Sequence, residues 1–192
     1  MHTHSLVATQ TRTLSTAEER REEILVAAEP LVAARGLHAT PTLEVARAAG
    51  ISQAYLFRLF PTKVELGVAL VERCNDRIHR AFADAAVEAR RDGTDVLEAM
   101  GRAYKPLVRD RTMLLLQLHA HAASPHVPEI REAMRTGFGR LVDFVSAETG
   151  AEPLEVKRFF AHGMLINVLL AMGAYDLDEP WARALTAEYG AC

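Results

Sequence analysis

The chain has little cysteine, proline or glycine, and each shortage excludes a class of protein. Its two cysteines, Cys74 and Cys192, are far apart and belong to no Cys-x-x-Cys or Cys/His group. This usage argues against a disulfide framework and against a zinc site, and it favours a reducing, cytoplasmic location. With 8 prolines and 11 glycines among 192 residues, the chain is also neither a collagen-like nor a low-complexity protein.

A second absence is that of strand-like patterning. Val, Ile and Thr never alternate with polar residues over the length of a strand, whereas Ala, Leu, Glu and Arg are abundant. Hydrophobic residues make up 49% and charged residues 24% of the chain, which is the balance of a globular protein. The sequence therefore predicts an all-α fold.

Long apolar segments are missing as well. Residues 1–14 have no continuous apolar core followed by a small-residue cleavage site, so we expect a flexible arm and not a signal peptide. Residues 159–175 lack Asp, Glu, Lys and Arg, but a membrane span needs about 20 residues, and His162 and Asn167 lie inside this stretch. It is predicted to be a buried or interface helix with no membrane partner.

The net charge of −3 hides a local excess of positive charge. Between residues 35 and 63 there are four basic side chains and one acidic side chain, while residues 67–192 are acidic overall. A small basic surface on an acidic molecule is compatible with DNA binding, although by itself it is a weak signal.

Capping residues divide the first third of the chain into three short helices and the start of a long one. Ser15 or Thr16 with nearby glutamates predicts a first helix that ends at Gly36. Thr40 followed by proline predicts a second helix over 41–49, with Thr40 as its N-cap. Ser52 predicts a third over 53–59, and Thr62 a long helix from 63 to about 90.

The rest of the chain is predicted to form a bundle of helices that are separated by turn residues. Helices are expected over 95–109, 112–123, 128–148, 153–174 and 180–189. The predicted domains are the arm (1–14), a DNA-binding domain (15–66) and a helical effector-binding and dimerisation domain (67–192).

Residues 41–59 have the pattern of a helix-turn-helix motif. Ala46 is a small residue where two helices cross closely, and Gly50 marks the turn. An apolar set can fix the two helices against the first one: Val45, Ala49, Ile51, Leu56 and Phe60. The residues left outward on the second helix suit contacts with a DNA groove and its phosphates: Gln53, Ala54, Tyr55 and Arg58.

Residues 24–66 resemble the DNA-binding domain of TetR-family transcriptional regulators. The matching positions, at matching spacing, are Gly36, Thr40, Val45-Ala46, Ala49-Gly50-Ile51-Ser52, Leu56, Phe60, Lys63 and Leu66. The resemblance implies that Thr40 and Lys63 contact phosphate. It further implies that the major groove is faced by Ser52, Gln53, Ala54, Tyr55 and Arg58. For Arg47 a phosphate contact and a plain solvent-facing role stay equally open, and Gln53 and Arg58 have the alternative of being ordinary solvated residues.

Three positions depart from the family pattern. Phe57 stands where tyrosine is usual, which removes a hydroxyl able to bond phosphate, and Leu59 replaces the usual histidine. Tyr55 occupies a position where threonine is common, and its hydroxyl or its ring is a candidate for the missing contact.

For residues 67–192 the resemblance implies only a helical architecture, a dimer interface and an effector pocket. The interface is expected on the helix over 153–174, through Gly163, Leu165, Val168, Leu169 and Met172, with a buried intramolecular helix as the alternative. The pocket candidates, each of which has plain core packing as its alternative, are Met100, Tyr104, Leu107, Met113, Leu116, Gln117, His121 and Phe138. His119 and His121 point to different faces of one helix, so no metal and no cofactor is expected.

The hypothesis from the sequence is a ligand-responsive repressor that binds a palindromic DNA operator as a homodimer, with a small-molecule effector and no enzymatic activity. No Ser/His/Asp group, phosphate loop or metal-ligand spacing supports catalysis. Two alternatives stay open: a small-molecule binding protein or enzyme whose three-helix unit is only structural, and an activator or effector-independent DNA binder.

Overall fold

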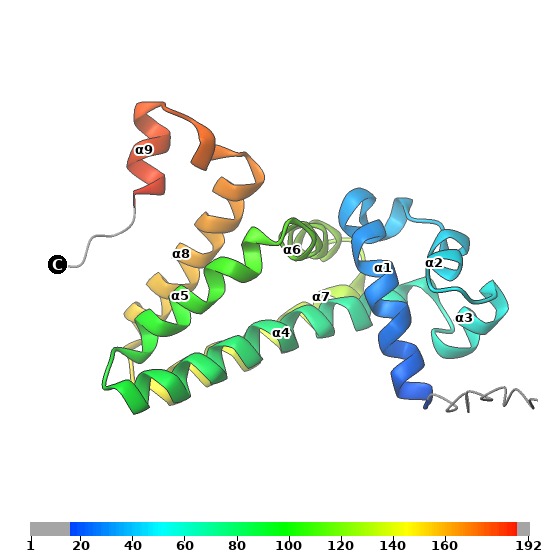
Figure 1. Cartoon of the computed structure of the whole chain (residues 1–192), viewed down its shortest axis with the longest axis horizontal. Helices are drawn as coiled ribbons and strands as arrows, with labels where there is room; N and C mark the ends of the chain where they lie inside the picture. The colour runs from blue at the N-terminus through cyan, green and yellow to red at the C-terminus, as the bar shows by residue number, and fades with distance from the viewer. Residues whose placement is uncertain (1–15, 188–192) are drawn as a thin grey trace, which may run out of the picture.

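The computed structural model describes residues 16–187, and within that range every regular element is a helix, so the predicted all-α class is confirmed. The predicted arm (1–14) lies outside the described residues. The helices are α1 (Ala17–Ala39), α2 (Thr42–Ala48), α3 (Gln53–Leu59), α4 (Lys63–Asp92), α5 (Val96–Arg109), α6 (Arg111–Ala123), α7 (Pro128–Thr149), α8 (Pro153–Ala171), the 3₁₀ turn η1 (Ala174–Asp176) and α9 (Pro180–Thr186). Helices α1–α3 form one end of the molecule and α8–α9 lie at the other (Figure 1).

Helix α1 begins with a reciprocal cap and breaks where glycine was expected to end it. The Thr16 hydroxyl accepts a bond from the Glu19 amide while the Glu19 carboxylate accepts one from the Thr16 amide. At Gly36 the backbone leaves the helical region, with φ 77° and ψ 160°, and one more short turn follows. Only glycine adopts this conformation without strain. The break directs the chain from α1 into α2.

Thr40 does not cap α2, contrary to the sequence prediction. The N-cap position is Pro41, which makes no side-chain cap bond. The Thr40 hydroxyl instead donates to the carbonyl oxygens of Gly36, at 2.8 Å, and Leu31, at 3.2 Å. It therefore stabilises the end of α1, where the break at Gly36 leaves carbonyl groups without helical partners.

A first core holds α1, α2 and α3 together and also takes in the start of α4. It includes Ile24 from α1, Val45 from α2, Leu56 from α3 and Leu66 from α4. Leu116 from α6 belongs to the same core, which ties it to the larger helical bundle. The predicted boundary after residue 66 falls within α4, so no linker separates the DNA-binding helices from the rest of the chain.

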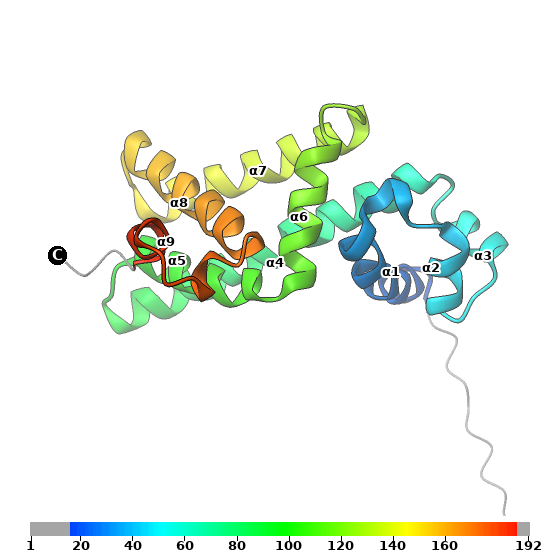
Figure 2. The ribbon, with the colours of Figure 1, turned by 90° about the horizontal axis from the view of Figure 1, so that it is seen from above.

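Helix α4 is the longest element and carries the second core along its further length. Thr62 caps its N-terminus, where the hydroxyl accepts from the Glu65 amide at 3.0 Å. From the end near α1 it runs alongside α5 and α7, as Figures 1 and 2 show. The second core lies among α4–α8 and includes Phe82, Met100, Tyr104 and Val145.

Near the chain end the helices are shorter than predicted. The helix expected over 153–174 ends at Ala171, because Gly173 takes a left-handed conformation, and a 3₁₀ turn replaces its last part. The helix expected over 180–189 ends at Thr186, and the positions after residue 187 lie outside the described range. Within residues 16–187 no helix has both the length and the apolar character needed to cross a membrane.

A partly buried cluster of charged side chains joins α1, α4 and the start of α6. The Glu29 carboxylate accepts a bond from Arg73 Nε at 2.6 Å and lies 3.6 Å from Arg77. Arg77 in turn lies 3.5 Å from Asp110, which caps α6. Burial raises the pKa of Glu29, and the charge of Arg77 offsets part of that rise. This cluster links the DNA-binding helices to the bundle through side chains of α1 and α4 and through the residue that caps α6.

Candidate DNA-binding surface and ligand cavity

The α2–turn–α3 unit has the geometry expected of a helix-turn-helix. Gly50 takes a left-handed φ of 65° in the turn, and the Ile51 amide then donates to the Ala46 carbonyl at 2.9 Å. The Ser52 hydroxyl caps α3 by accepting from the Tyr55 amide at 3.1 Å. Leu56 is buried against α1 and α2, which leaves the opposite face of α3 directed outward (Figure 1).

The outward face of α3 carries a cation beside aromatic rings. Ala54, Phe57 and Arg58 are exposed, and Tyr55 is half-buried. The Arg58 guanidinium carbon lies 4.9 Å from the centre of the Tyr55 ring, within the range of a cation–π contact. The ring limits the freedom of a side chain that can contact phosphate or the edge of a guanine.

Gln53 is held at the α2–α3 junction. Its Nε2 donates to the Thr42 hydroxyl at 2.8 Å, and the side chain is half-buried. The bond fixes the direction of the amide and connects it to Thr42, a residue that the sequence analysis did not single out. No local signal marked Thr42, since its role depends on how α2 packs against α3.

Two of the predicted phosphate contacts have internal partners. Thr40 is 1% exposed and its hydroxyl bonds the end of α1, so the expectation of a phosphate contact from this side chain is wrong for this structure. Lys63 Nζ donates to the His38 carbonyl at 2.7 Å, and partial burial lowers the pKa of the lysine. The ammonium therefore sits where the end of α1 meets the N-terminus of α4.

The basic surface is smaller than the count of side chains implies. Arg35 pairs with Glu44, and this hydrogen bond raises the pKa of the arginine and lowers that of the glutamate. Of the four basic residues between 35 and 63, Arg47 and Arg58 are then left to act on DNA phosphates, together with Lys63, whose ammonium also donates to the His38 carbonyl.

Phe57 is an outward residue absent from the predicted contact set. Its ring is 38% exposed although it is one of the larger apolar side chains of the short α3. Its position in the sequence could have indicated a DNA contact, because the family pattern has a tyrosine there. An exposed ring there can pack against a thymine methyl or a sugar.

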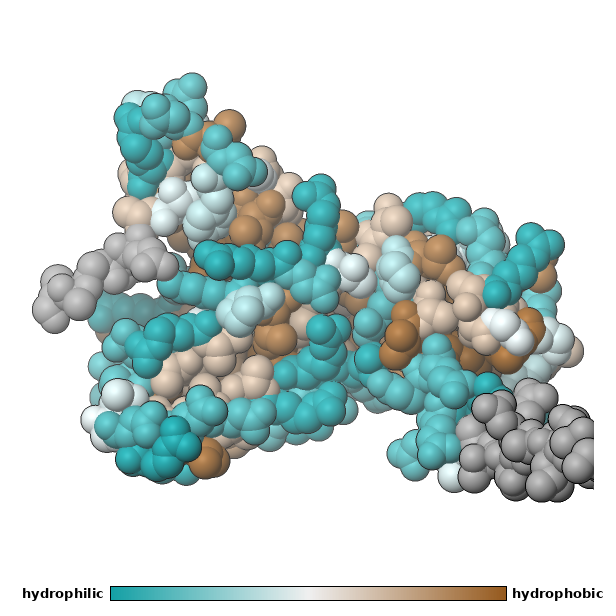
Figure 3. Space-filling model, in the orientation of Figure 1, coloured by the Kyte–Doolittle hydropathy of each residue, from teal (hydrophilic) through white to brown (hydrophobic). Residues whose placement is uncertain are grey.

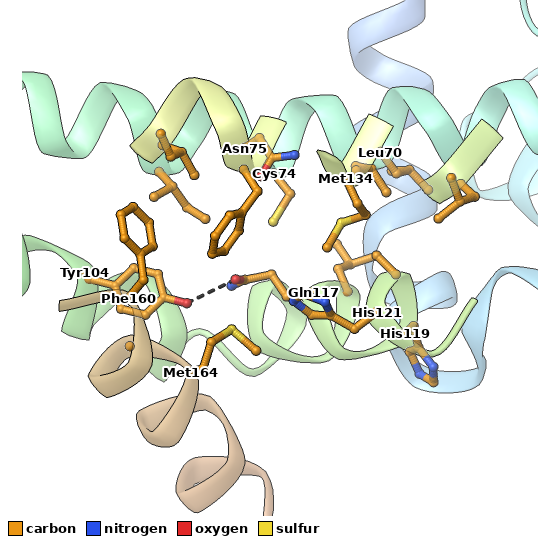
Figure 4. A pocket seen from close by; sticks show the side chains of 18 of the residues that line it. Leu70, Cys74, Asn75, Tyr104, Gln117, His119, His121, Met134, Phe160 and Met164 are labelled. Carbon is orange, nitrogen blue, oxygen red and sulfur yellow. Dashed lines mark hydrogen bonds between the residues drawn. The ribbon is translucent and has the colours of Figure 1, made fainter. Parts of the chain in front are cut away.

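The bundle contains a cavity of about 120 Å³ that reaches from α1 to α8. Five predicted pocket residues line it: Tyr104, Leu116, Gln117, His121 and Phe138. The other three, Met100, Leu107 and Met113, do not line it and pack in the second core instead, which corrects the prediction. The sequence also missed lining residues such as Cys74 of α4, Met134 of α7, and Phe160 and Met164 of α8 (Figure 4).

Polar side chains meet at one end of this cavity. Tyr104 Oη lies 3.0 Å from Gln117 Oε1 and 3.0 Å from Asn167 Oδ1, and Figure 4 shows the first of these contacts. Asn167 is fully buried behind the cavity wall. Burial raises the pKa of Tyr104 to about 12 and that of Cys74 to about 12, so both are uncharged at neutral pH.

Helix α6 connects the cavity with the DNA-binding helices. Gln117 faces the polar end of the cavity, whereas His119 extends toward α1 (Figure 4). His119 Nε2 lies 3.1 Å from the Ala33 carbonyl oxygen, and a methyl group at Gly36 would lie 3.1 Å from the His119 ring. Helix α6 therefore contacts the segment where α1 breaks.

His121 gives the structure a dependence on pH. Burial lowers the pKa of its imidazole below the ordinary value of 6.5. The unfolded chain then binds a proton more readily than the folded chain, so the free energy of unfolding falls as pH drops through about 6.5. For one group the slope is at most about 1.4 kcal/mol per pH unit.

We expect His121→Gln to reduce this slope between pH 7 and pH 5, measured by urea unfolding at each pH. His126→Gln is the matched control, because His126 is exposed in the turn after α6. Equal slopes for the wild type and His121→Gln would contradict the assignment.

The predicted interface residues of α8 divide between two faces. Val168 and Met172 are 45% and 60% exposed. Leu169 is 2% exposed and packs inside its own chain, so its prediction as an interface residue is wrong. Gly163 lines the cavity, where a methyl group would lie 3.6 Å from the Tyr104 ring, and Leu165 is half-buried. Only the outer face of α8 is left for a partner.

Comparison with known proteins gives matches in sequence and in fold. The profile described as bacterial regulatory proteins, tetR family, matches residues 24–70. The HTH-type transcriptional activator FasR of Mycolicibacterium smegmatis is 26% identical over 166 residues, which cover 85% of this chain and 75% of the relative.

Two solved structures share the fold. A transcriptional regulator from Rhodococcus sp. Rha1 has a TM-score of 0.66 and 20% identity, covering 86% of this chain and 91% of its own. A transcriptional regulator from Saccharomonospora viridis in complex with choline has a TM-score of 0.61 and 20% identity, covering 90% of this chain and 88% of its own. The α2–turn–α3 unit, the profile match over residues 24–70 and the curated relative together show that this chain is similar to DNA-binding transcriptional regulators of the TetR family.

Proposed function

We propose that this regulator binds a palindromic operator as a homodimer and that a small molecule in the cavity changes its affinity for DNA. The observation that carries the proposal is the outward face of α3, where Arg58 is exposed on a helix whose other face is buried in the first core. In a two-fold dimer two such helices enter successive major grooves, roughly 34 Å apart. A protein with this task acts in the cytoplasm, where the chromosome lies.

Contacts along α6 support the ligand response. The same helix supplies Gln117 to the cavity, Leu116 to the core of the DNA-binding helices and His119 to the Ala33 carbonyl. A ligand that binds one position of α6 better than another shifts the population of α1 positions, and with it the spacing of the two α3 helices. The choline-bound relative has a ligand in a protein of this fold.

Selection of duplexes with the purified protein tests the DNA-binding proposal. Genomic fragments retained by the protein are expected to share an inverted repeat whose half-sites are one helical turn apart. Retention of fragments without a common repeat would favour the alternative of a small-molecule binding protein whose helix-turn-helix is only structural.

A second copy of the chain is the proposed partner of α8 and α9. Their outer side carries exposed apolar side chains, and apolar residues are visible at this end of the molecule in Figure 3. The exposed set is Val168, Met172, Tyr175, Leu177, Trp181 and Leu185. Several exposed apolar side chains gathered on neighbouring elements favour an interaction site, and a symmetric dimer uses the same surface twice.

Met172→Glu is therefore expected to convert the dimer into a monomer. Each substitution places an unpaired carboxylate in the interface, and two-fold symmetry doubles its effect, so the dimer is expected to weaken by more than about 100-fold. Sedimentation velocity measures the change. Val87→Glu is the control, because Val87 is 64% exposed on α4 and does not belong to the exposed set of α8 and α9. A dimer that survives Met172→Glu at wild-type affinity places the interface elsewhere.

The direction of regulation has two candidates. The sequence predicts a repressor, which blocks a promoter when bound and releases it with ligand. The curated relative is named an activator, which favours the opposite sign. A reporter under the selected operator distinguishes them, since deletion of the regulator raises expression for a repressor and lowers it for an activator.

A further inference from the structure

The titratable side chains that line the cavity are Cys74, Tyr104, His119, His121 and His162. No Asp, Glu, Lys or Arg is among the described residues that line it, and most of the others are apolar. Burial keeps the Tyr104 phenol and the Cys74 thiol protonated, and it lowers the pKa of His121, so these three groups are neutral at pH 7.

The polar end of the cavity has more hydrogen-bond donors than acceptors. Tyr104 Oη lies against the amide oxygens of Gln117 and Asn167, but the phenol has one proton and can donate to only one of them. The other amide makes a hydrogen bond to Tyr104 only if it turns its NH₂ group toward the phenol oxygen. In the structure Gln117 Nε2 and Asn167 Nδ2 are both buried and have no partner. When Asn167 turns its nitrogen inward, Asn167 Nδ2 donates to Tyr104 Oη, the phenol donates to Gln117 Oε1, and Gln117 Nε2 is the NH₂ group left without an acceptor.

Gln117 is the one of these two amides that lines the cavity, whereas Asn167 lies behind Tyr104. Figure 4 shows the Gln117 side chain extending from α6 toward the space between Tyr104 and Cys74. Buried N–H groups are normally paired, because an unpaired donor loses its bond to water and gains nothing in return. A molecule in the cavity that brings an acceptor to Gln117 supplies the missing partner.

We propose that the effector is an uncharged, mainly hydrocarbon molecule with one carbonyl-type oxygen, and that this oxygen accepts a hydrogen bond from the Gln117 amide. The inference rests on the proposed ligand response and specifies its chemistry. Phe82, Phe159 and Phe160 form a wall of rings, with successive centroids 5.6 Å and 5.4 Å apart, which suits the hydrocarbon part. The volume of about 120 Å³ fits a compact molecule of the size class of a substituted benzene ring.

Charged ligands fit the site less well. A carboxylate that enters this cavity gives up its hydration and meets no Lys or Arg side chain, and an organic cation meets no carboxylate. The rings could attract a cation, but the unpaired group beside them is a donor, which repels positive charge.

Four probes of the same size and shape test the proposal: acetophenone, isopropylbenzene, benzoate and benzamidinium. Binding to the full chain is measured by isothermal titration calorimetry without DNA, so the result does not depend on knowing an operator. Acetophenone is expected to bind the wild type at least about tenfold more tightly than either ion.

Gln117→Met removes the donor and keeps the length of the side chain. We expect it to weaken acetophenone by about tenfold and to leave isopropylbenzene unchanged or slightly tighter. Comparing each probe across the two proteins cancels the different hydrophobicity of the probes. Leu118→Met is the matched control, because Leu118 is the next residue of α6 and does not line the cavity.

Tighter binding of benzoate or benzamidinium than of acetophenone would overturn the proposal. So would an equal effect of Gln117→Met on acetophenone and isopropylbenzene, or the binding of none of the four probes. If acetophenone binds as expected but operator affinity does not change in its presence, the ligand chemistry stands and the proposed ligand response fails.

Discussion

Arg58→Ala is expected to weaken operator binding by between about 30-fold and 10⁴-fold. An arginine contact with a base or a phosphate contributes about 1–3 kcal/mol, and a symmetric dimer loses two such contacts, so the expected loss is about 2–6 kcal/mol. Arg58 is exposed on α3 and held over the Tyr55 ring, so its removal changes the DNA surface without opening the core.

Fluorescence anisotropy with the selected operator at several salt concentrations measures this loss. If Arg58 contacts a phosphate, its removal reduces the slope of log affinity against log salt concentration. If Arg58 contacts a base, its removal leaves this slope unchanged and relaxes the sequence preference at one position. Arg102→Ala is the control, since Arg102 is an exposed arginine on α5 that pairs with Glu98. Wild-type affinity of a folded, dimeric Arg58→Ala protein would remove α3 from the proposed contact surface.

Phe60→Ala is expected to destabilise the protein by about 3–5 kcal/mol. The ring is fully buried at the end of α3, and its loss leaves a cavity in the first core that the surrounding helices fill only in part. Arg21 also stacks on this ring, with its guanidinium carbon 4.2 Å from the ring centre. The substitution therefore removes packing between α1, α3 and the start of α4.

Phe57→Ala is the matched comparison, because it removes the same side chain from the exposed face of the same helix. Its expected cost in stability is below about 1 kcal/mol, while its effect on operator affinity exceeds its effect on folding. Chemical unfolding measures the first quantity and anisotropy the second. Equal destabilisation by the two substitutions would contradict the orientation of α3 described above.

Helix starts were the most predictable part of the fold, because a capping residue and the residues just after it act within one turn. Thr16, Ser52 and Thr62 cap α1, α3 and α4 as the sequence indicates. The same reasoning predicted Thr40 as the N-cap of α2, and that prediction is wrong. Its hydroxyl is used by the broken end of α1, and that contact depends on the φ of Gly36, which the sequence around Thr40 does not reveal.

The orientation of apolar helices was the least predictable part. Residues 159–175 contain no charged side chain, so the sequence offers no polar face to show which side of α8 points outward. Val168 and Leu169 are adjacent and both apolar, yet one is exposed and the other buried. The same ambiguity explains the cavity residues, because Met100 and Tyr104 lie one turn apart on α5 and only Tyr104 reaches the cavity.

The presence of Leu116 in the first core limits how this regulator can be recombined. A chimera joined within α4 would combine the DNA-binding helices α1–α3 of one protein with the α6 of another. A different side chain would then have to fill the position of Leu116 in the first core. Successful hybrids are therefore expected to need the α6 surface, including His119, transplanted together with residues 16–70, even though the two segments are separated by 40 or more positions of sequence. The structural unit that must be transferred to change the operator preference is therefore made of two segments that are not adjacent in the sequence.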